Sequence, residues 1–162
     1  MEPAFHEEQR LTQWWIRLIA VLMAALGWWA FVAQIVIGEP WGTNPAPDWA
    51  IWLILVFIGL ALPGLLLFAK LVVTVDKECV RIRWIPFARR TLPLADIESA
   101  ETRTYRPLLE YGGWGVRFSF RHGTAWNASG DRGVQLVLTT GKRLLIGSQR
   151  PEELEAAIRG EE

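Results

Sequence analysis

Few residues of this chain have the type and spacing of a catalytic or metal-binding site. The two histidines, His6 and His122, lie in an acidic N-terminal segment and in an Arg-His-Gly turn, and this separation predicts no metal pair. Cys79 is the single cysteine, which excludes an intrachain disulfide and a cysteine-rich metal site. No serine lies in a Gly-x-Ser-x-Gly elbow. We therefore predict no cofactor, no metal site and no enzymatic activity.

The glycine-rich run from Gly112 to Gly115 superficially resembles a phosphate-binding loop. It lacks a terminal Lys-Ser or Lys-Thr pair and precedes a predicted strand rather than a helix, so we interpret it as a strand entry that needs glycine conformations. Asp96, Glu98 and Glu101 are scattered on a predicted strand among basic residues. This placement favours surface ion pairs over acid–base catalysis.

Arginines that follow the second apolar run offer a binding chemistry. Six of them could contact anionic lipid headgroups: Arg81, Arg83, Arg89, Arg90, Arg117 and Arg121. The alternative for each is a solvated outer strand face. Because the first predicted hairpin turn, Asp76-Lys77-Glu78, is short and acidic, we expect weak and nonspecific headgroup contact at most.

Protein interaction or self-assembly is the function that we favour from the sequence. Trp114 and Trp126 are the candidate contact residues, and strand edges could pair with a partner. Core packing is the alternative for either tryptophan. The same evidence fits an accessory subunit of a larger membrane complex. We predict no nucleic-acid binding, because the predicted soluble helix is acidic and no basic tail is present.

Two apolar runs precede residue 70, from Leu18 to Ile37 and from Trp49 to Ala69, and no ionisable side chain interrupts either. Each holds about 20 residues, or roughly 30 Å of helix, which matches the hydrocarbon thickness of a bilayer. The sequence therefore predicts an integral membrane protein with two spans, 18–37 and 49–69. The acidic start of the chain and the absence of a small-residue cleavage site argue against a signal peptide.

The distribution of basic residues predicts the orientation of the two spans. The connection 38–48 holds no Lys or Arg and is rich in Pro and Gly, whereas Arg10 and Arg17 precede the first span and Lys70 follows the second. We expect an N-terminal cytoplasmic tail at 1–17, an external loop at 38–48 with Trp41 near the outer interface, and a cytoplasmic domain at 70–162. This arrangement predicts an inner-membrane protein with both termini in the cytoplasm.

The segment after Lys70 has the alternation of a β domain. In the strand after the Asp76-Lys77-Glu78 turn, we expect Val80, Ile82 and Trp84 to point one way and Arg81 and Arg83 the other. About seven antiparallel strands are predicted, followed by an amphipathic helix at 151–160 that begins at Pro151. In the strand near Trp114 to Phe120 we expect Val116, Phe118 and Phe120 to point inward. We predict a polar excursion at 123–130 and a hairpin around Thr140-Gly141-Lys142.

Seven strands capped by a C-terminal helix resemble a pleckstrin-homology-like barrel or sandwich. The chain resembles bacterial membrane proteins that pair two spans with such a domain. The resembling segments are Thr91–Ile97, Tyr105–Arg117, Gly133–Leu138, Gly141–Gly147 and Pro151–Leu154. The resemblance implies a membrane α+β protein, in which a transmembrane helical hairpin precedes the domain. It supplies no catalytic residues, because the families that it points to lack an assigned function.

Overall fold

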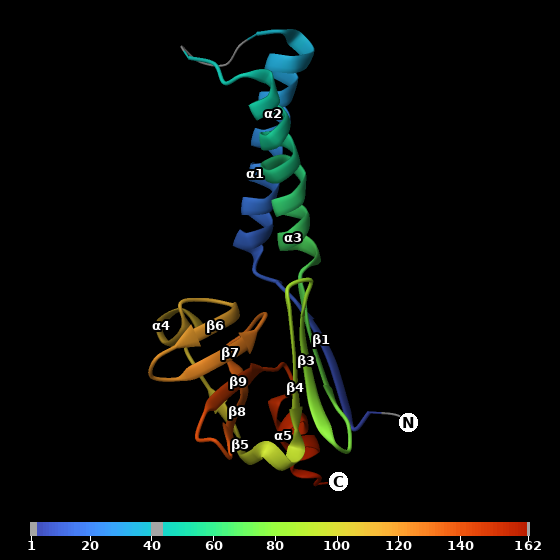
Figure 1. Cartoon of the computed structure of the whole chain (residues 1–162), viewed down its shortest axis with the longest axis vertical. Coiled ribbons are helices and arrows are strands. Elements are labelled where there is room, and N and C mark those ends of the chain that lie inside the picture. The colour runs from blue at the N-terminus through green and yellow to red at the C-terminus, as the bar shows by residue number, and fades with distance from the viewer. Residues whose placement is uncertain (1–2, 40–43, 162) are drawn as a thin grey trace. The chain divides into compact units, whose positions relative to one another are not determined.

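The computed structural model describes residues 3–39 and 44–161 and divides into two compact units (Figure 1). The helical unit holds residues 11–68, and the β unit combines the chain up to Arg10 with the chain from Ala69 onward. The N-terminal segment therefore belongs to the same unit as the C-terminal domain. Residues 40–43 of the predicted loop, with Trp41, lie outside the described residues.

The helical unit consists of two long apolar helices, as the sequence predicts. The first runs through α1 (Trp14–Phe31) and the π-helical turn η1 (Val32–Ile37). The second runs through α2 (Asp48–Ile54), the π-helical turn η2 (Leu55–Ala61) and α3 (Leu62–Phe68). They hold 24 and 21 residues and are long and apolar enough to cross a membrane. The first helix begins at Trp14, inside the segment predicted as a tail.

The backbones of the two long helices approach each other closely at a pair of glycines. A Cβ added to Gly27 of α1 would lie 2.7 Å from both Cα and N of Gly59 in η2. The ring of Phe31 packs against that of Trp52, with 4.8 Å between ring centroids. Gln34, the most polar side chain in either run, donates hydrogen bonds to the Ala46 carbonyl (2.7 Å) and to Oδ1 of Asp48 (3.0 Å). The first helix is thereby linked to the segment that starts the second.

The first sheet of the β unit has four antiparallel strands in the order β1-β2-β3-β4. These strands are β1 (Phe5–Arg10), β2 (Lys70–Val75), β3 (Cys79–Ile85) and β4 (Ala88–Pro93). Val73, Val75, Val80 and Ile82 are fully buried on the inner face. This alternation of buried and exposed side chains is the one that the sequence predicts for β3.

Strand β1 was not predicted, because its sequence is polar. Phe5, Glu7 and Gln9 face inward and are buried, with His6, Glu8 and Arg10 outward. Gln9 Nε2 donates to the Gly147 carbonyl (2.8 Å), and the Glu7 carboxylate accepts two further hydrogen bonds. These bonds compensate for the loss of water around the buried side chains. Residues 5–10 are thus a sheet strand, not a tail.

The second sheet has five strands in the order β5-β8-β9-β7-β6, so the described residues form nine strands, two more than predicted. The strands are β5 (Ile97–Thr104), β6 (Gly115–Ser119), β7 (Gly123–Asn127), β8 (Arg132–Leu138) and β9 (Arg143–Gly147). Neighbours pair antiparallel except β7 and β9. Strand β7 occupies the segment predicted as a polar excursion, and Gly123, at φ 80°, begins it.

Three short helices complete the β unit: η3 (Leu94–Asp96), α4 (Pro107–Tyr111) and α5 (Pro151–Arg159). Helix α5 contacts β5 and β8 of the second sheet and β1 and β2 of the first (Figure 1). Its Leu154 is fully buried and Ile158 nearly so, which confirms the predicted apolar face. A separate small core forms on the other side of the second sheet from Tyr105, Tyr111, Ala125 and Leu145.

Candidate interaction surface

Strand β6 forms an edge of the five-stranded sheet and carries exposed apolar side chains. Val116 and Phe118 pair with Trp126 and Thr124 of β7, so they share one face of the sheet. The exposed fractions are 66% for Phe118 and 99% for Phe120, which follows β6. The prediction that Val116, Phe118 and Phe120 point inward was wrong, because the strand that carries them lies at the border of the sheet.

Helix α4 adds a second apolar group beside β6. Leu108 and Leu109 are 65% and 78% exposed, and α4 contacts β6. Pro107 occupies the first turn of α4, and Gly112 ends it with φ 72°. We define the β6 surface as Val116, Phe118 and Phe120, because α4 packs through Tyr111 on Ala125, which lies on the opposite face of the sheet. The Phe118 and Phe120 rings meet edge to face, with 5.3 Å between centroids.

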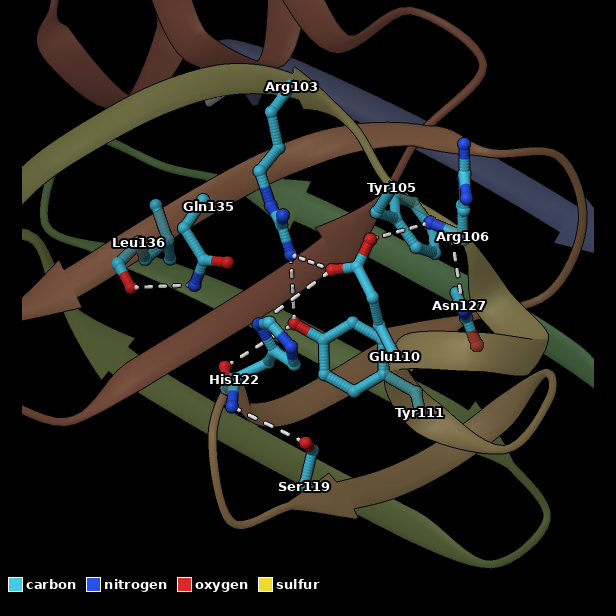
Figure 2. Close-up of polar contacts among 10 residues, drawn as sticks. All are labelled: Arg103, Tyr105, Arg106, Glu110, Tyr111, Ser119, His122, Asn127, Gln135 and Leu136. Carbon is cyan, nitrogen blue, oxygen red and sulfur yellow. Dashed lines mark hydrogen bonds and ion pairs between the residues drawn. The ribbon is translucent and has the colours of Figure 1, made fainter.

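A polar cluster holds α4 against the β6–β7 turn (Figure 2). The Arg103 guanidinium on β5 donates to Oε2 of Glu110 (2.8 Å) and to the Tyr111 hydroxyl (3.2 Å). The amide of Arg106 donates to the other Glu110 oxygen (2.8 Å). Tyr111 in turn donates to the His122 carbonyl (3.3 Å), and Nδ1 of His122 lies 3.8 Å from Glu110. The cluster therefore fixes the turn that follows Phe120.

The pKa values in this cluster follow from burial and from the hydrogen bonds. Burial alone would raise the pKa of Glu110, but the Arg106 amide and the Arg103 guanidinium outweigh it and hold the pKa below its ordinary value. Burial raises the pKa of Tyr105 to about 12 and also raises the pKa of Tyr111. Both phenols therefore stay protonated near neutral pH, and the Tyr111 hydroxyl donates to the His122 carbonyl.

Asn127 joins the polar cluster to the start of β6. It is fully buried, its Nδ2 donates to the Tyr105 hydroxyl (3.0 Å), and its Oδ1 accepts from the amide of Gly115 (2.9 Å). Together with the Arg103 and Glu110 contacts, these bonds fix the position of α4 and of the first residue of β6, the strand that carries the β6 surface. Among residues 3–39 and 44–161, no group of three or more His, Cys, Asp or Glu side chains is arranged to hold a metal ion.

The sequence matches the model of a family described as a family of unknown function, DUF6141, over residues 3–161. The chain belongs to the DUF6141 family. The match spans β1, both long helices and the whole β unit, so the discontinuous β unit lies inside the family region. No curated protein matches the chain significantly.

The structure of this DUF6141 protein brings together some of the predicted arginines and separates others. Arg83 lies opposite Arg89, and Arg81 opposite Thr91, so these three arginines share the outer face of the first sheet. Arg90 pairs with buried Ile82 and therefore lies on the opposite face of β4. Arg117 and Arg121 lie elsewhere, on β6 and in the β6–β7 turn.

The two predicted tryptophans have different environments in the DUF6141 fold. Trp114 is partly exposed, and its Nε1 donates to the Gly130 carbonyl (3.1 Å). Trp126 is only 5% exposed, which is the core packing that the sequence left open as its alternative. Sequence reasoning missed Leu108 and Leu109. A signal was available, since two leucines between Pro107 and Gly112 lie in a segment too short to form a buried helix.

Proposed function

We propose that this chain is a non-enzymatic inner-membrane protein with two spans that displays the β unit as a protein-interaction module at the cytoplasmic membrane surface. The β6 surface is the observation that carries the interaction role. The partner that we propose is an extended protein segment with apolar side chains, which adds a strand to β6.

Exposed apolar side chains support the membrane part of the proposal. Only 17% and 22% of the most apolar windows of the two long helices is buried, unlike the core helices of soluble proteins. Leu22 and Phe57, at 58% and 59% exposed, typify the side chains that need a hydrocarbon solvent. A soluble monomer would expose all of this surface to water.

Pairing of β1 with β2 supports a helical hairpin with both ends on one side of the membrane. Arg10 lies opposite Lys70 in the sheet, and these residues flank the helical unit in the sequence. A single sheet can form from both segments only if they reach the same aqueous compartment. The lack of Lys and Arg in the connection 38–48 supports a cytoplasmic location for that compartment.

The arrangement of β6 supports strand addition. Within the described part of the chain, β6 pairs with β7 alone, so its second edge keeps main-chain donors and acceptors for a partner strand. Phe118 and the flanking Phe120 provide apolar contacts beside that edge. Main-chain hydrogen bonds give affinity in this mode of recognition, and alternate side chains give specificity.

Two sheets and a C-terminal helix that contacts both of them support the resemblance to a pleckstrin-homology-like domain of bacterial membrane proteins. Strands β1 and β7 extend the seven-strand pattern that the sequence predicts. The interaction role does not depend on this relationship, because it rests on the exposed edge itself.

Photo-crosslinking in cells tests the interaction role. The photoreactive residue benzoylphenylalanine replaces Phe118 in one full-length variant and exposed Lys77, in the β2–β3 turn, in the control. We expect a covalent protein adduct from position 118 and none from position 77. An adduct of twice the 18.4 kDa chain mass identifies self-association, and another mass identifies a different partner. Equal yields at the two positions, or no adduct at either, would contradict the proposal.

A further inference from the structure

The hairpin formed by β3 and β4 is strongly basic. Residues 79–93 contain no Asp or Glu and four arginines: Arg81, Arg83, Arg89 and Arg90. Arg81 pairs with Asp76 of the preceding turn (2.9 Å). Across residues 3–39 and 44–161, no carboxylate lies within ion-pair distance of the other three guanidinium groups. The charge near the tip is therefore not neutralised by the β unit.

Arg83 and Arg89 face each other directly across the hairpin. Like charges in this position repel, and an anion between them would remove the repulsion. An open groove of about 780 Å³ follows the hairpin and is lined by residues 81–91, which include all four arginines. Guanidinium groups bind phosphate oxygens through paired N–H donors, so the groove suits phosphate-bearing ligands.

The tip of the hairpin carries an exposed aromatic ring. Phe87 is 64% exposed in the turn between β3 and β4, where its amide donates to the Trp84 carbonyl (2.8 Å). Its neighbour Pro86 is also exposed. An apolar tip backed by arginines is the combination that binds the boundary between headgroups and acyl chains, because each part meets its preferred environment.

Strand register places this tip at the end of the sheet where the chain joins the helical unit. Lys70 lies opposite both Arg10 and Ile85, so Pro86 and Phe87 follow directly beside it. Ala69 is the single residue between the end of α3 at Phe68 and the start of β2 at Lys70. With α3 as the end of the second span, the chain enters β2 one residue after that span ends.

We infer that the β3–β4 hairpin binds the anionic surface of the membrane that the two long helices cross, with Phe87 inserted among the lipids and Arg83, Arg89 and Arg90 at the phosphates. This inference rests on the two spans of the proposed function and not on its protein partner. It selects three of the six arginines that the sequence offered for headgroup contact, and it adds an aromatic anchor.

A fluorescent depth probe tests the inference in the full-length chain. Cys79 is replaced by serine, and a nitrobenzoxadiazole label is attached to a new cysteine, made by Phe87→Cys in one variant and by Lys77→Cys in the control. Position 77 lies at the opposite end of the same sheet. Both variants are reconstituted into phosphatidylcholine vesicles with and without phosphatidylglycerol, and quenching by doxyl-labelled lipid is measured.

We expect strong quenching at position 87 in vesicles that contain phosphatidylglycerol, weaker quenching without it, and none at position 77. Each of Arg83→Gln, Arg89→Gln and Arg90→Gln should lower the ratio of docked to undocked hairpin about fivefold. The double variant Arg117→Gln, Arg121→Gln should leave it unchanged. Equal quenching at positions 87 and 77, or equal loss from both sets of arginine variants, would refute the hairpin contact.

Flotation of the chain with the vesicles tests the two spans independently of the hairpin contact. A chain that fails to float with the vesicles overturns the two spans and the hairpin contact together. A chain that floats, but whose label at position 87 remains in water, overturns the hairpin contact alone and leaves the spans intact.

Discussion

Glu7 of the first strand accepts a 2.6 Å hydrogen bond from the Ser148 hydroxyl, near the start of the last helix. Its second carboxylate oxygen accepts from the amide of Gln149 (2.8 Å). Glu7 and Ser148 are 6% and 2% exposed, so water does not replace these bonds. A polar side chain from the segment before the helical unit thus completes the interior of the domain that follows it.

Removal of the Glu7 carboxylate should destabilise the β unit. Glu7→Ala leaves the Ser148 hydroxyl proton and the Gln149 amide without acceptors, which we expect to cost about 2 to 3 kcal/mol of unfolding free energy. Urea unfolding of the full-length protein in detergent, followed by circular dichroism, measures the change. Glu8→Ala is the matched control, since this neighbouring carboxylate lies on the outer face and pairs with Lys70. Equal losses from the two variants would argue against a buried role for Glu7.

The glycine contact between the two long helices should not tolerate side chains. Gly27→Leu places a side chain where the backbone of Gly59 lies, and we expect the helical unit to lose about 1 to 3 kcal/mol through overpacking. Gly64→Leu is the control, because nothing lies within 4 Å of a Cβ at that position. Thermal unfolding in detergent compares the two. If Gly64→Leu destabilised the protein as much as Gly27→Leu, the contact between Gly27 and Gly59 would not explain the effect.

The two tyrosines of the chain should titrate late. Both lie in the small core under α4, and burial raises the pKa of Tyr105 to about 12. Absorbance at 295 nm should show less tyrosinate at pH 10 in the folded protein than in guanidinium. Tyr105→Phe should remove the later transition. Coincident titration curves for the folded and unfolded chains would contradict this prediction.

The raised pKa of Tyr105 also predicts that the folded protein loses stability at alkaline pH. The folded-state pKa of Tyr105 lies above its unfolded value of 10.0, so its contribution to stability is complete below pH 10. That contribution is lost as the pH rises toward 12. Stability measured across this range should fall less steeply in Tyr105→Phe than in the native sequence.

Glu110 should make the protein less stable as the pH falls, whereas Tyr105 makes it less stable as the pH rises. Its folded-state pKa is lowered from 4.5, so its contribution is present above pH 4.5 and is lost as the pH falls through the lower folded value. Glu110→Gln should therefore flatten the acid limb of the stability profile. Glu98→Gln, which changes an exposed carboxylate on β5, serves as the control. Identical acid limbs in the native sequence and in Glu110→Gln would show that this carboxylate does not contribute.

The sequence predicted most reliably the helices and strands whose apolar residues follow a regular pattern. Two uninterrupted apolar runs predicted both long helices, and alternation predicted β3 and its outward arginines. Strand β1 escaped prediction because Glu7 and Gln9 are buried polar residues, whose partners at Gly147 and Ser148 are distant in sequence. Local patterns cannot reveal partners that only the fold brings together.

The candidate surfaces were predicted only in part, for a similar reason. Alternation shows which residues share a face of a strand, and it correctly grouped Arg81 with Arg83. It does not show whether that strand lies inside a sheet or at its border. We therefore predicted Phe118 to be a core residue, although β6 lies at the edge of the sheet and the ring is exposed.

The discontinuous β unit imposes an order on biosynthesis. Strand β1 leaves the ribosome before either long helix, and its partner β2 emerges only after the second helix has been translated. The nascent N-terminal segment must therefore wait, unpaired, while the two long helices are translated. Completion of this domain is therefore a late event that follows synthesis of everything between its two pieces.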